Sequence, residues 1–160
     1  MIRKKKLYVR PRKLYEKGRI KEENILLEKY ALKNKREIWK TLAKMNYFKR
    51  RARELAQTGE EEQKILFDKL NKIGLNVKNI ADVLALKIEN LLERRLPTIV
   101  FRKKLSATLK QARQMVAHKR VMISEKVVNS PSYVVQVEEE NKITLKHKNI
   151  KPKKEEIQNV

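Results

Sequence analysis

The densest group of residues that could do chemistry lies between positions 94 and 130, where ten Lys and Arg residues stand against a single acid. In the middle of this stretch Thr108 is followed three positions later by Gln111, a pattern that predicts a helix N-terminus with a capping box. The free backbone amides at such a helix end favour an anion, and Lys104 and Lys110 lie close to it in the sequence. The chemistry expected here is therefore the binding of phosphate groups.

A second basic block precedes it. Residues 1–58 contain 20 basic and 6 acidic residues, a net charge of +14, while residues 94–130 have a net charge of +9. Between them, residues 59–93 have 5 basic and 7 acidic residues, and residues 131–160 have 6 and 5. This pattern indicates two anion-binding surfaces on a scaffold with a polyanionic partner. The alternative is a surface that only keeps the chain soluble, but solubility needs far less charge than the +22 of this chain.

Enzymatic chemistry finds little support. The chain has no Cys, which excludes disulfides, thiolate metal sites and cysteine nucleophiles. Its three glycines have no phosphate-loop spacing, and its only aspartates, Asp68 and Asp82, both lie in the nearly neutral stretch. No Ser/His/Asp arrangement is suggested by spacing. We therefore expect no catalytic residues, no cofactor and no metal.

Helical periodicity dominates the part of the chain that would carry the first basic block. Helices are predicted over residues 19–30, 35–56, 60–73, 82–84 and 88–92. Asn34 is expected to cap the second of these, with Glu37 as its capping-box partner. Trp39 is expected to lie in the core rather than on a binding surface.

The pattern changes after Pro97, which we take as a boundary. One helix is predicted over residues 109–118, and β-branched runs predict short strands over 121–123, 127–128, 133–137 and 143–145. Tyr133 is expected to be half-buried against this sheet. The predicted fold class is thus α+β, with an N-terminal all-helical domain followed by a small α+β module.

Four segments are expected along the chain: a basic extended arm at 1–17, the helical domain at 18–95, the α+β module at 96–145 and a basic tail at 146–160. No apolar run approaches the roughly 20 residues that span a bilayer. The positive start of the chain is not followed by the apolar segment of a secretory signal, so the expected location is the cytoplasm.

The later part of the chain resembles the S-four RNA-binding module. The matching residues are Arg94-Arg95-Leu96, Thr98-Ile99-Val100, Lys110-Gln111-Ala112-Arg113-Gln114, His118 and Val127-Val128-Asn129-Ser130-Pro131-Ser132-Tyr133.

The earlier part resembles the S-four family of small-subunit ribosomal proteins, of archaeal/eukaryotic type. The matching residues are Arg10-Pro11-Arg12, Glu22-Glu23-Asn24, Leu32-Lys33-Asn34-Lys35-Arg36-Glu37-Ile38-Trp39 and Arg51-Ala52-Arg53-Glu54-Leu55. The resemblance covers roughly residues 8–145. It is specific because the two segments match independently and in the right order.

The resemblance implies a structural constituent of the small ribosomal subunit that binds small-subunit ribosomal RNA early in assembly. It also implies a place near the channel through which messenger RNA enters, beside the S-five protein, where the family affects decoding accuracy. The RNA-binding residues expected in the module are Arg95, Arg102, Lys103, Lys104, Thr108, Lys110, Gln111, Arg113, Gln114, His118, Lys119 and Arg120. Those expected in the first block are Arg10, Arg12, Lys35, Arg36, Lys49, Arg50, Arg51 and Arg53. His118 could equally be a packing residue at a helix end.

Two departures from the family pattern concern glycine. The family often has His-Gly-His at the place of His118-Lys119-Arg120, and Asp-Gly or Asn-Gly at the place of Ser124-Glu125. A two-residue type I′ turn without Gly is strained, so we expect this hairpin loop to differ in shape. The cysteine cluster of many bacterial relatives is absent, and no zinc is expected.

The S-four module also occurs in proteins that do not belong to the ribosome. The alternative function is therefore that of an RNA-binding protein outside the ribosome. RNA-modifying enzymes with this module need an added catalytic domain, and the remaining residues here are accounted for by helices and tails. A stress-related RNA-binding protein would lack the long match at residues 8–57.

Overall fold

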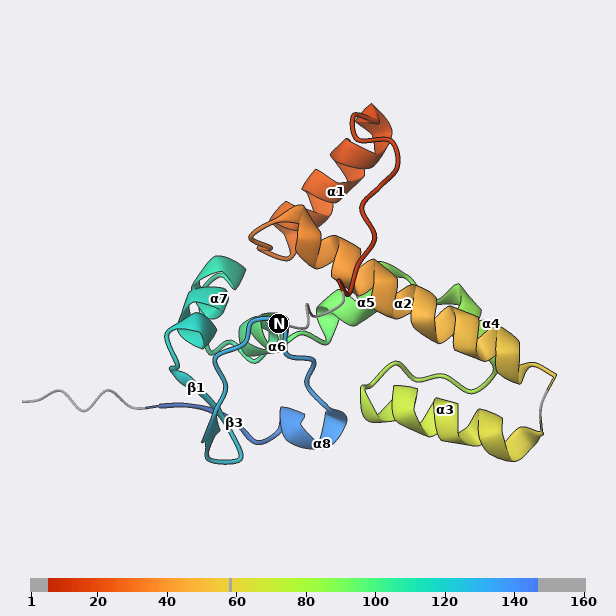
Figure 1. The fold of residues 1–160 in the computed structure, drawn as a ribbon. Coiled ribbons are helices and arrows are strands. Elements are labelled where there is room, and N and C mark those ends of the chain that lie inside the picture. Colours follow the sequence, from red (N-terminus) through yellow and green to blue (C-terminus); the bar gives the residue numbers. More distant parts are fainter. Residues whose placement is uncertain (1–5, 58, 147–160) are drawn as a thin grey trace, which may run out of the picture.

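The computed structural model describes residues 6–57 and 59–146 (Figure 1). In chain order its elements are α1 (Lys17–Lys29), α2 (Lys35–Leu55), α3 (Glu60–Lys72), α4 (Ile80–Ala85), α5 (Ile88–Glu93), α6 (Leu96–Arg102), α7 (Leu109–Ala117), β1 (Val121–Ile123), β2 (Lys126–Val127), α8 (Val137–Glu140) and β3 (Ile143–Leu145). None of the helices described is both long and apolar enough to cross a membrane.

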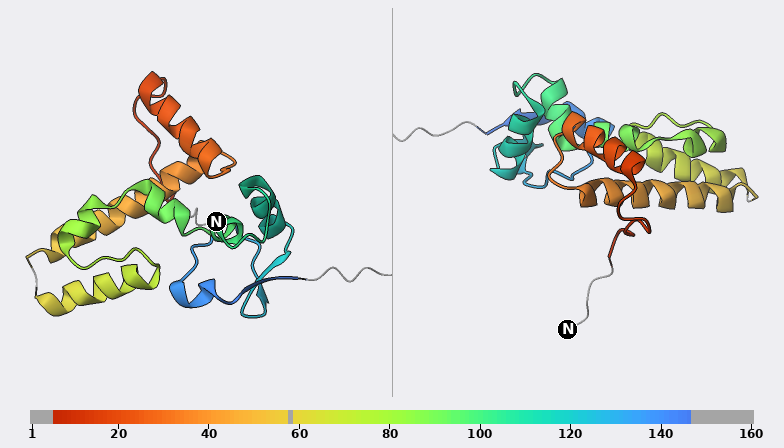
Figure 2. Two further views of the ribbon diagram at one scale, coloured as in Figure 1. Left: turned by 180° about the vertical axis from the view of Figure 1, so that it is seen from behind. Right: turned by 90° about the horizontal axis from the view of Figure 1, so that it is seen from above.

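The long helix α2 organises the helical part because α1, α3, α4 and α5 all pack against it (Figures 1 and 2). One core cluster joins Met45, Phe48 and Ala52 of α2 to Leu66 and Leu70 of α3. A second cluster lies where α1 and α5 meet the start of α2. The apolar stripe of α2 therefore forms the spine of this part, and its many basic residues are left at the surface.

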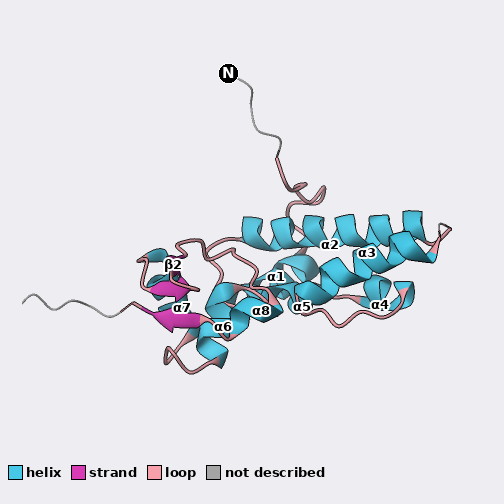
Figure 3. Cartoon of the chain, turned by 90° about the horizontal axis from the view of Figure 1, so that it is seen from below, coloured by secondary structure: helices cyan, strands magenta, loops and turns pink. Residues whose placement is uncertain are grey.

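The later part of the chain has its own core, in which α6 and α7 pack against a three-stranded sheet. The strand order is β2-β1-β3, and both pairings are antiparallel. Leu96, Ile99, Ala112, Val116 and Val121 are fully buried in this cluster. Figure 3 shows the strands gathered at one end of the molecule, away from α3 and α4. The predicted α+β class is confirmed.

The expected boundary at Pro97 coincides with the start of a helix. Pro97 lies in the first turn of α6, where the missing amide of proline costs no helical hydrogen bond. The predicted strand over residues 133–137 is reduced to a single bridge between Val134 and Arg95, and Val137 begins α8 instead. The three glutamates of α8 stand in its first turn, where they complement the helix dipole.

The hairpin between β1 and β2 keeps the left-handed backbone of a two-residue turn although it lacks glycine. Ser124 has φ 45° and Glu125 has φ 70°, between the paired residues Ile123 and Lys126. The expected change of loop shape does not occur, and two non-glycine residues adopt a strained backbone conformation instead. Lys119, just after α7, has φ 58° at the position where the family has Gly.

Candidate nucleic-acid interface

The N-terminus of α7 is capped as its sequence predicts, with one difference. The Thr108 hydroxyl accepts a hydrogen bond from the backbone amide of Gln111 (3.2 Å). The Gln111 side chain accepts one from the amide of Ala107 (2.9 Å), one residue before the cap rather than at it. The two side chains therefore fix the start of the helix in the middle of the second basic block.

Helix α7 presents three different surfaces. Ala112 and Val116 are fully buried in the module core. Arg113 points to α2, where its guanidinium binds Glu37. Gln114 and His118 are exposed on the remaining side, which is free for a ligand.

Glu37 joins the two parts of the molecule. At the start of α2 its carboxylate accepts from the amide of Lys33 (3.4 Å), one residue before the predicted partner Asn34. The Asn34 side chain makes no capping hydrogen bond. One Glu37 carboxylate oxygen accepts from Arg95 (2.7 Å) and from Arg113 (3.2 Å), and the other accepts from Arg113 (2.6 Å). We call Glu37, Arg95 and Arg113 the Glu37 clamp. It ties α2 to the start of α6 and to α7.

The clamp is well shielded from solvent, with 14% of the Glu37 side chain and 6% of the Arg95 side chain exposed. Burial acts to raise the pKa of Glu37, but the hydrogen bonds and charges of Arg113 and Arg95 outweigh it and hold the pKa below its ordinary value. The carboxylate is therefore ionised at neutral pH. Arg95, predicted as an RNA contact, is instead occupied by Glu37 and by the Ser132 hydroxyl (3.0 Å).

Several other predicted contacts also have partners within the chain. Lys35 pairs with Glu23 (3.4 Å), Arg102 pairs with Glu93 (3.5 Å), and Lys103 donates to the carbonyl of Glu140. The pairs of Lys35 and Arg102 involve side chains 31% and 51% exposed, so these two cations still face solvent.

Apart from Arg50 and Arg51, the remaining predicted cations are exposed or half-exposed and have no hydrogen-bond or ion-pair partner in the part of the chain that the structure describes. They fall into three groups. The arm contributes Arg10 and Arg12, α2 contributes Arg36, Lys49 and Arg53, and the module contributes Lys104, Lys110, Lys119 and Arg120. We call the last four the module cations. The cations of the arm and of α2 both belong to the first basic block, so the structure holds two sets of free cations, one from each block, on a body joined by the Glu37 clamp.

The described part of the arm is held to the first helices by a buried glutamate. Glu23 accepts hydrogen bonds from Arg19 (2.7 Å) and from the Trp39 indole (2.9 Å). Arg19 in turn donates to the backbone carbonyls of Lys13 and Leu14 (2.8 and 2.9 Å). Trp39 is half-buried rather than fully in the core: its indole donates to Glu23, and its ring centroid lies 6.0 Å from that of Tyr8 in the arm.

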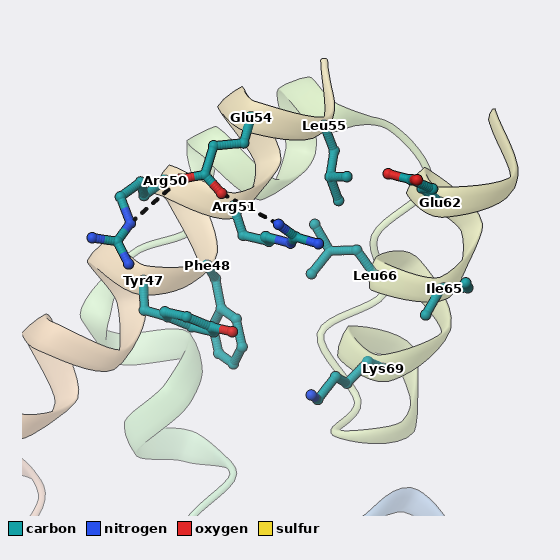
Figure 4. Close-up of a pocket in the computed structure, with 10 residues that line it drawn as sticks. All are labelled: Tyr47, Phe48, Arg50, Arg51, Glu54, Leu55, Glu62, Ile65, Leu66 and Lys69. Atoms are coloured by element: carbon teal, nitrogen blue, oxygen red, sulfur yellow. Dashed lines mark hydrogen bonds and ion pairs between the residues drawn. The ribbon is translucent and has the colours of Figure 1, made fainter. Parts of the chain in front are cut away.

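A pocket of about 600 Å³ lies between α2 and α3, with Arg50 and Arg51 at its rim (Figure 4). Both arginines reach Glu54, at 3.7 and 3.4 Å, and Lys69 of α3 lines the same pocket. These exposed pairs are weak, so the two arginines can exchange Glu54 for a phosphate at little cost.

Sequence reasoning missed Glu37 as a clamp and Glu23 as an anchor for the arm. It also missed the pair that Arg94 forms with Glu140 (2.8 Å). One signal was available: Glu37 is the only acid between Lys29 and Arg53, and a lone acid in a basic run needs a reason. Within the described residues no group of three His, Asp or Glu side chains could hold a metal ion.

Comparison with known proteins agrees with this architecture. Residues 94–141, which contain α6, α7, β1, β2 and α8, match the S4 domain. The molecule is thus an S4-domain protein with a helical region in front of that domain.

The relatives extend the match to most of the chain. Small ribosomal subunit protein uS4 of Methanococcus aeolicus is 44% identical over 146 residues, covering 87% of this chain and 82% of that protein. The uS4 proteins of Picrophilus torridus and Halobacterium salinarum are 40% and 41% identical and are covered to 81% and 82%. The chain belongs to the uS4 family of small ribosomal subunit proteins, which are structural proteins and not enzymes.

Proposed function

We propose that this protein binds small-subunit ribosomal RNA through two basic surfaces and joins the small subunit early in its assembly. The observation that carries the proposal is the Glu37 clamp between two sets of free cations. Folded RNA is recognised largely through its shape and backbone, which demands cations at fixed separations. A body locked by a shielded carboxylate supplies those separations.

The module cations support phosphate contact in a second way. Lys104 and Lys110 flank the capped N-terminus of α7, whose amides and dipole add to their attraction for an anion. Lys119 and Arg120 extend the positive charge beyond the other end of the helix. Each phosphate that these side chains neutralise releases condensed counterions, so binding should weaken steeply with salt.

Further parts of the proposal rest on the family resemblance. We propose cytoplasmic ribosomes as the location, the S-five protein as a neighbour, and messenger RNA near its entrance channel as a further contact. In this setting the protein supports decoding accuracy.

The binding test uses the full chain and a transcribed fragment of small-subunit ribosomal RNA. Lys110→Ala should weaken binding about threefold to tenfold and lower the salt slope by about 1. Lys64→Ala, at an exposed lysine of α3 in the nearly neutral stretch, is the matched control and should change neither. If both variants behave like the unchanged protein, the module cations do not contact RNA. Arg113 is unsuitable for this test because its replacement also breaks the clamp.

Sedimentation separates the ribosomal role from an RNA-binding role outside the ribosome. In a sucrose gradient at moderate salt, the protein should move with the small subunit. A protein that binds RNA fragments but stays at the top of the gradient would instead have the alternative function.

A further inference from the structure

One hollow on the S4 domain has a lining that phosphate binding does not explain. Gln111, Gln114, Met115 and His118 recur at helical spacing and so share one side of α7. Together with two residues from the flanking segments, Leu105 and Arg120, they enclose about 270 Å³.

The polar groups around this hollow include both donors and acceptors. Neither the Gln114 amide nor the Arg120 guanidinium has a hydrogen-bond partner within the described ranges 6–57 and 59–146. The oxygen of Gln111 serves the amide of Ala107, which leaves its NH₂ group available. A phosphate offers only acceptors, so the Gln114 oxygen would receive no hydrogen bond from it. A base edge offers donors and acceptors side by side and can pair with both ends of the amide.

The apolar part of the lining suits a flat ring. Leu105 and Met115 are half-buried and pack against the module core, so they form a fixed floor. The His118 imidazole is an aromatic plane, and the Arg120 guanidinium is a cationic one, on which a base can stack. Among the residues that the structure describes, no acid lines the hollow.

We propose that this hollow takes one unpaired base of the bound RNA, held by Gln114 and stacked on the side chains around it. The inference rests on the proposed RNA binding, and it adds a point of base recognition to a surface that otherwise contacts the backbone. The neighbouring module cations Lys110 and Lys119 would hold the phosphates on either side of that nucleotide.

Two RNAs separate base binding from phosphate binding. The first is a mixed-sequence single strand of about twelve nucleotides, a length in the range of known single-strand sites. The second has the same length and charge but is abasic throughout. Gln114→Ala should weaken binding of the first about tenfold, the order of one lost base contact, and leave binding of the second unchanged. Lys110→Ala is the control and should weaken both.

Each other outcome overturns the inference. Equal weakening of both RNAs by Gln114→Ala would make the hollow a phosphate site, and no weakening of either would leave it without a role. If Lys110→Ala and the salt dependence behave as expected while Gln114→Ala does not, only this inference fails. If neither RNA binds at low salt, the proposed function fails with it. His118→Ala provides a second variant at an exposed position and should again weaken only the base-bearing strand.

Discussion

Replacing Glu37 with Gln would remove the negative charge that Arg95 and Arg113 share while keeping the shape of the side chain. Gln retains one acceptor oxygen, so the charged hydrogen bonds become neutral, and the amide NH₂ that replaces the other oxygen cannot accept from an arginine. Arg95 is the more costly arginine to deprive of a charged partner, because its side chain is 6% exposed and Ser132 supplies only a neutral one. Breaking a buried ion pair from one side costs about 3–5 kcal/mol. With one hydrogen bond retained, we expect a loss of about 3 kcal/mol in the free energy of unfolding.

The same carboxylate predicts a dependence on pH. The folded-state pKa of Glu37 lies below its ordinary value, because hydrogen bonds from Arg113 and Arg95 outweigh the effect of burial. A depressed pKa stabilises the fold above the unfolded-state pKa of about 4.3, and the contribution is lost as the pH falls through the lower, folded-state value. The stability difference between the unchanged protein and Glu37→Gln should thus be constant from pH 6 to 8, on the neutral side of both pKa values. Below about pH 4 it should shrink.

Urea unfolding followed by Trp39 fluorescence and by circular dichroism measures both effects. Trp39 lies on α2 and reports on the helical part, while circular dichroism also reports on the S4 domain. Glu22→Gln, at an exposed glutamate of α1, makes the same chemical change and should cost less than about 0.5 kcal/mol. The reasoning about the clamp is refuted if Glu37→Gln is no more destabilising than Glu22→Gln, or if its cost is the same at low pH.

Three further predictions concern the backbone and the arm. Glu125→Gly should raise the free energy of unfolding in urea by about 1 kcal/mol, because it relieves a positive φ in the hairpin, whereas Glu22→Gly in α1 should lower it. Gly74→Ala should cost about 2 kcal/mol in the same assay, because Gly74 has φ 86° and a Cβ there would lie 2.9 Å from the guanidinium of the buried Arg94; Gly59→Ala, with open space around it, is the control. Glu23→Gln should loosen the arm and speed trypsin cleavage after Lys13, and an unchanged cleavage rate would show that Arg19 holds the arm without Glu23.

Much of the fold could be predicted because its signals are local. The apolar stripe of α2 has helical spacing and is buried, as predicted: Ile38, Met45, Ala52 and Leu55. Thr108 and Gln111, three positions apart, likewise predict the start of α7. The errors arose where one local signal has two meanings. Pro97 indicated a boundary but not that α6 begins there, and the β-branched pair Val134-Val135 is typical of a strand although here it makes only one bridge.

The binding surface was less predictable because charge counts do not reveal pairing. Arg95 and Arg113 look in the sequence like Lys104 and Lys110, yet the first two neutralise a glutamate 58 and 76 residues away. No periodicity connects positions so distant. The hollow beside Gln114 was equally hidden, since its lining combines one side of a helix with residues before and after it.

The long sequence separations of the Glu37 clamp also order the events of synthesis. Glu37 leaves the translating ribosome well before either of its arginines, and α1 to α5 can pack on one another while that carboxylate is still hydrated. The Glu37 clamp, which sets the orientation of the two halves, can close only when Arg113 has emerged, 76 residues after Glu37. During synthesis the molecule is therefore first a helical body followed by a segment that is not yet packed against it. The spacing between its two sets of cations is fixed only afterwards, when the clamp closes.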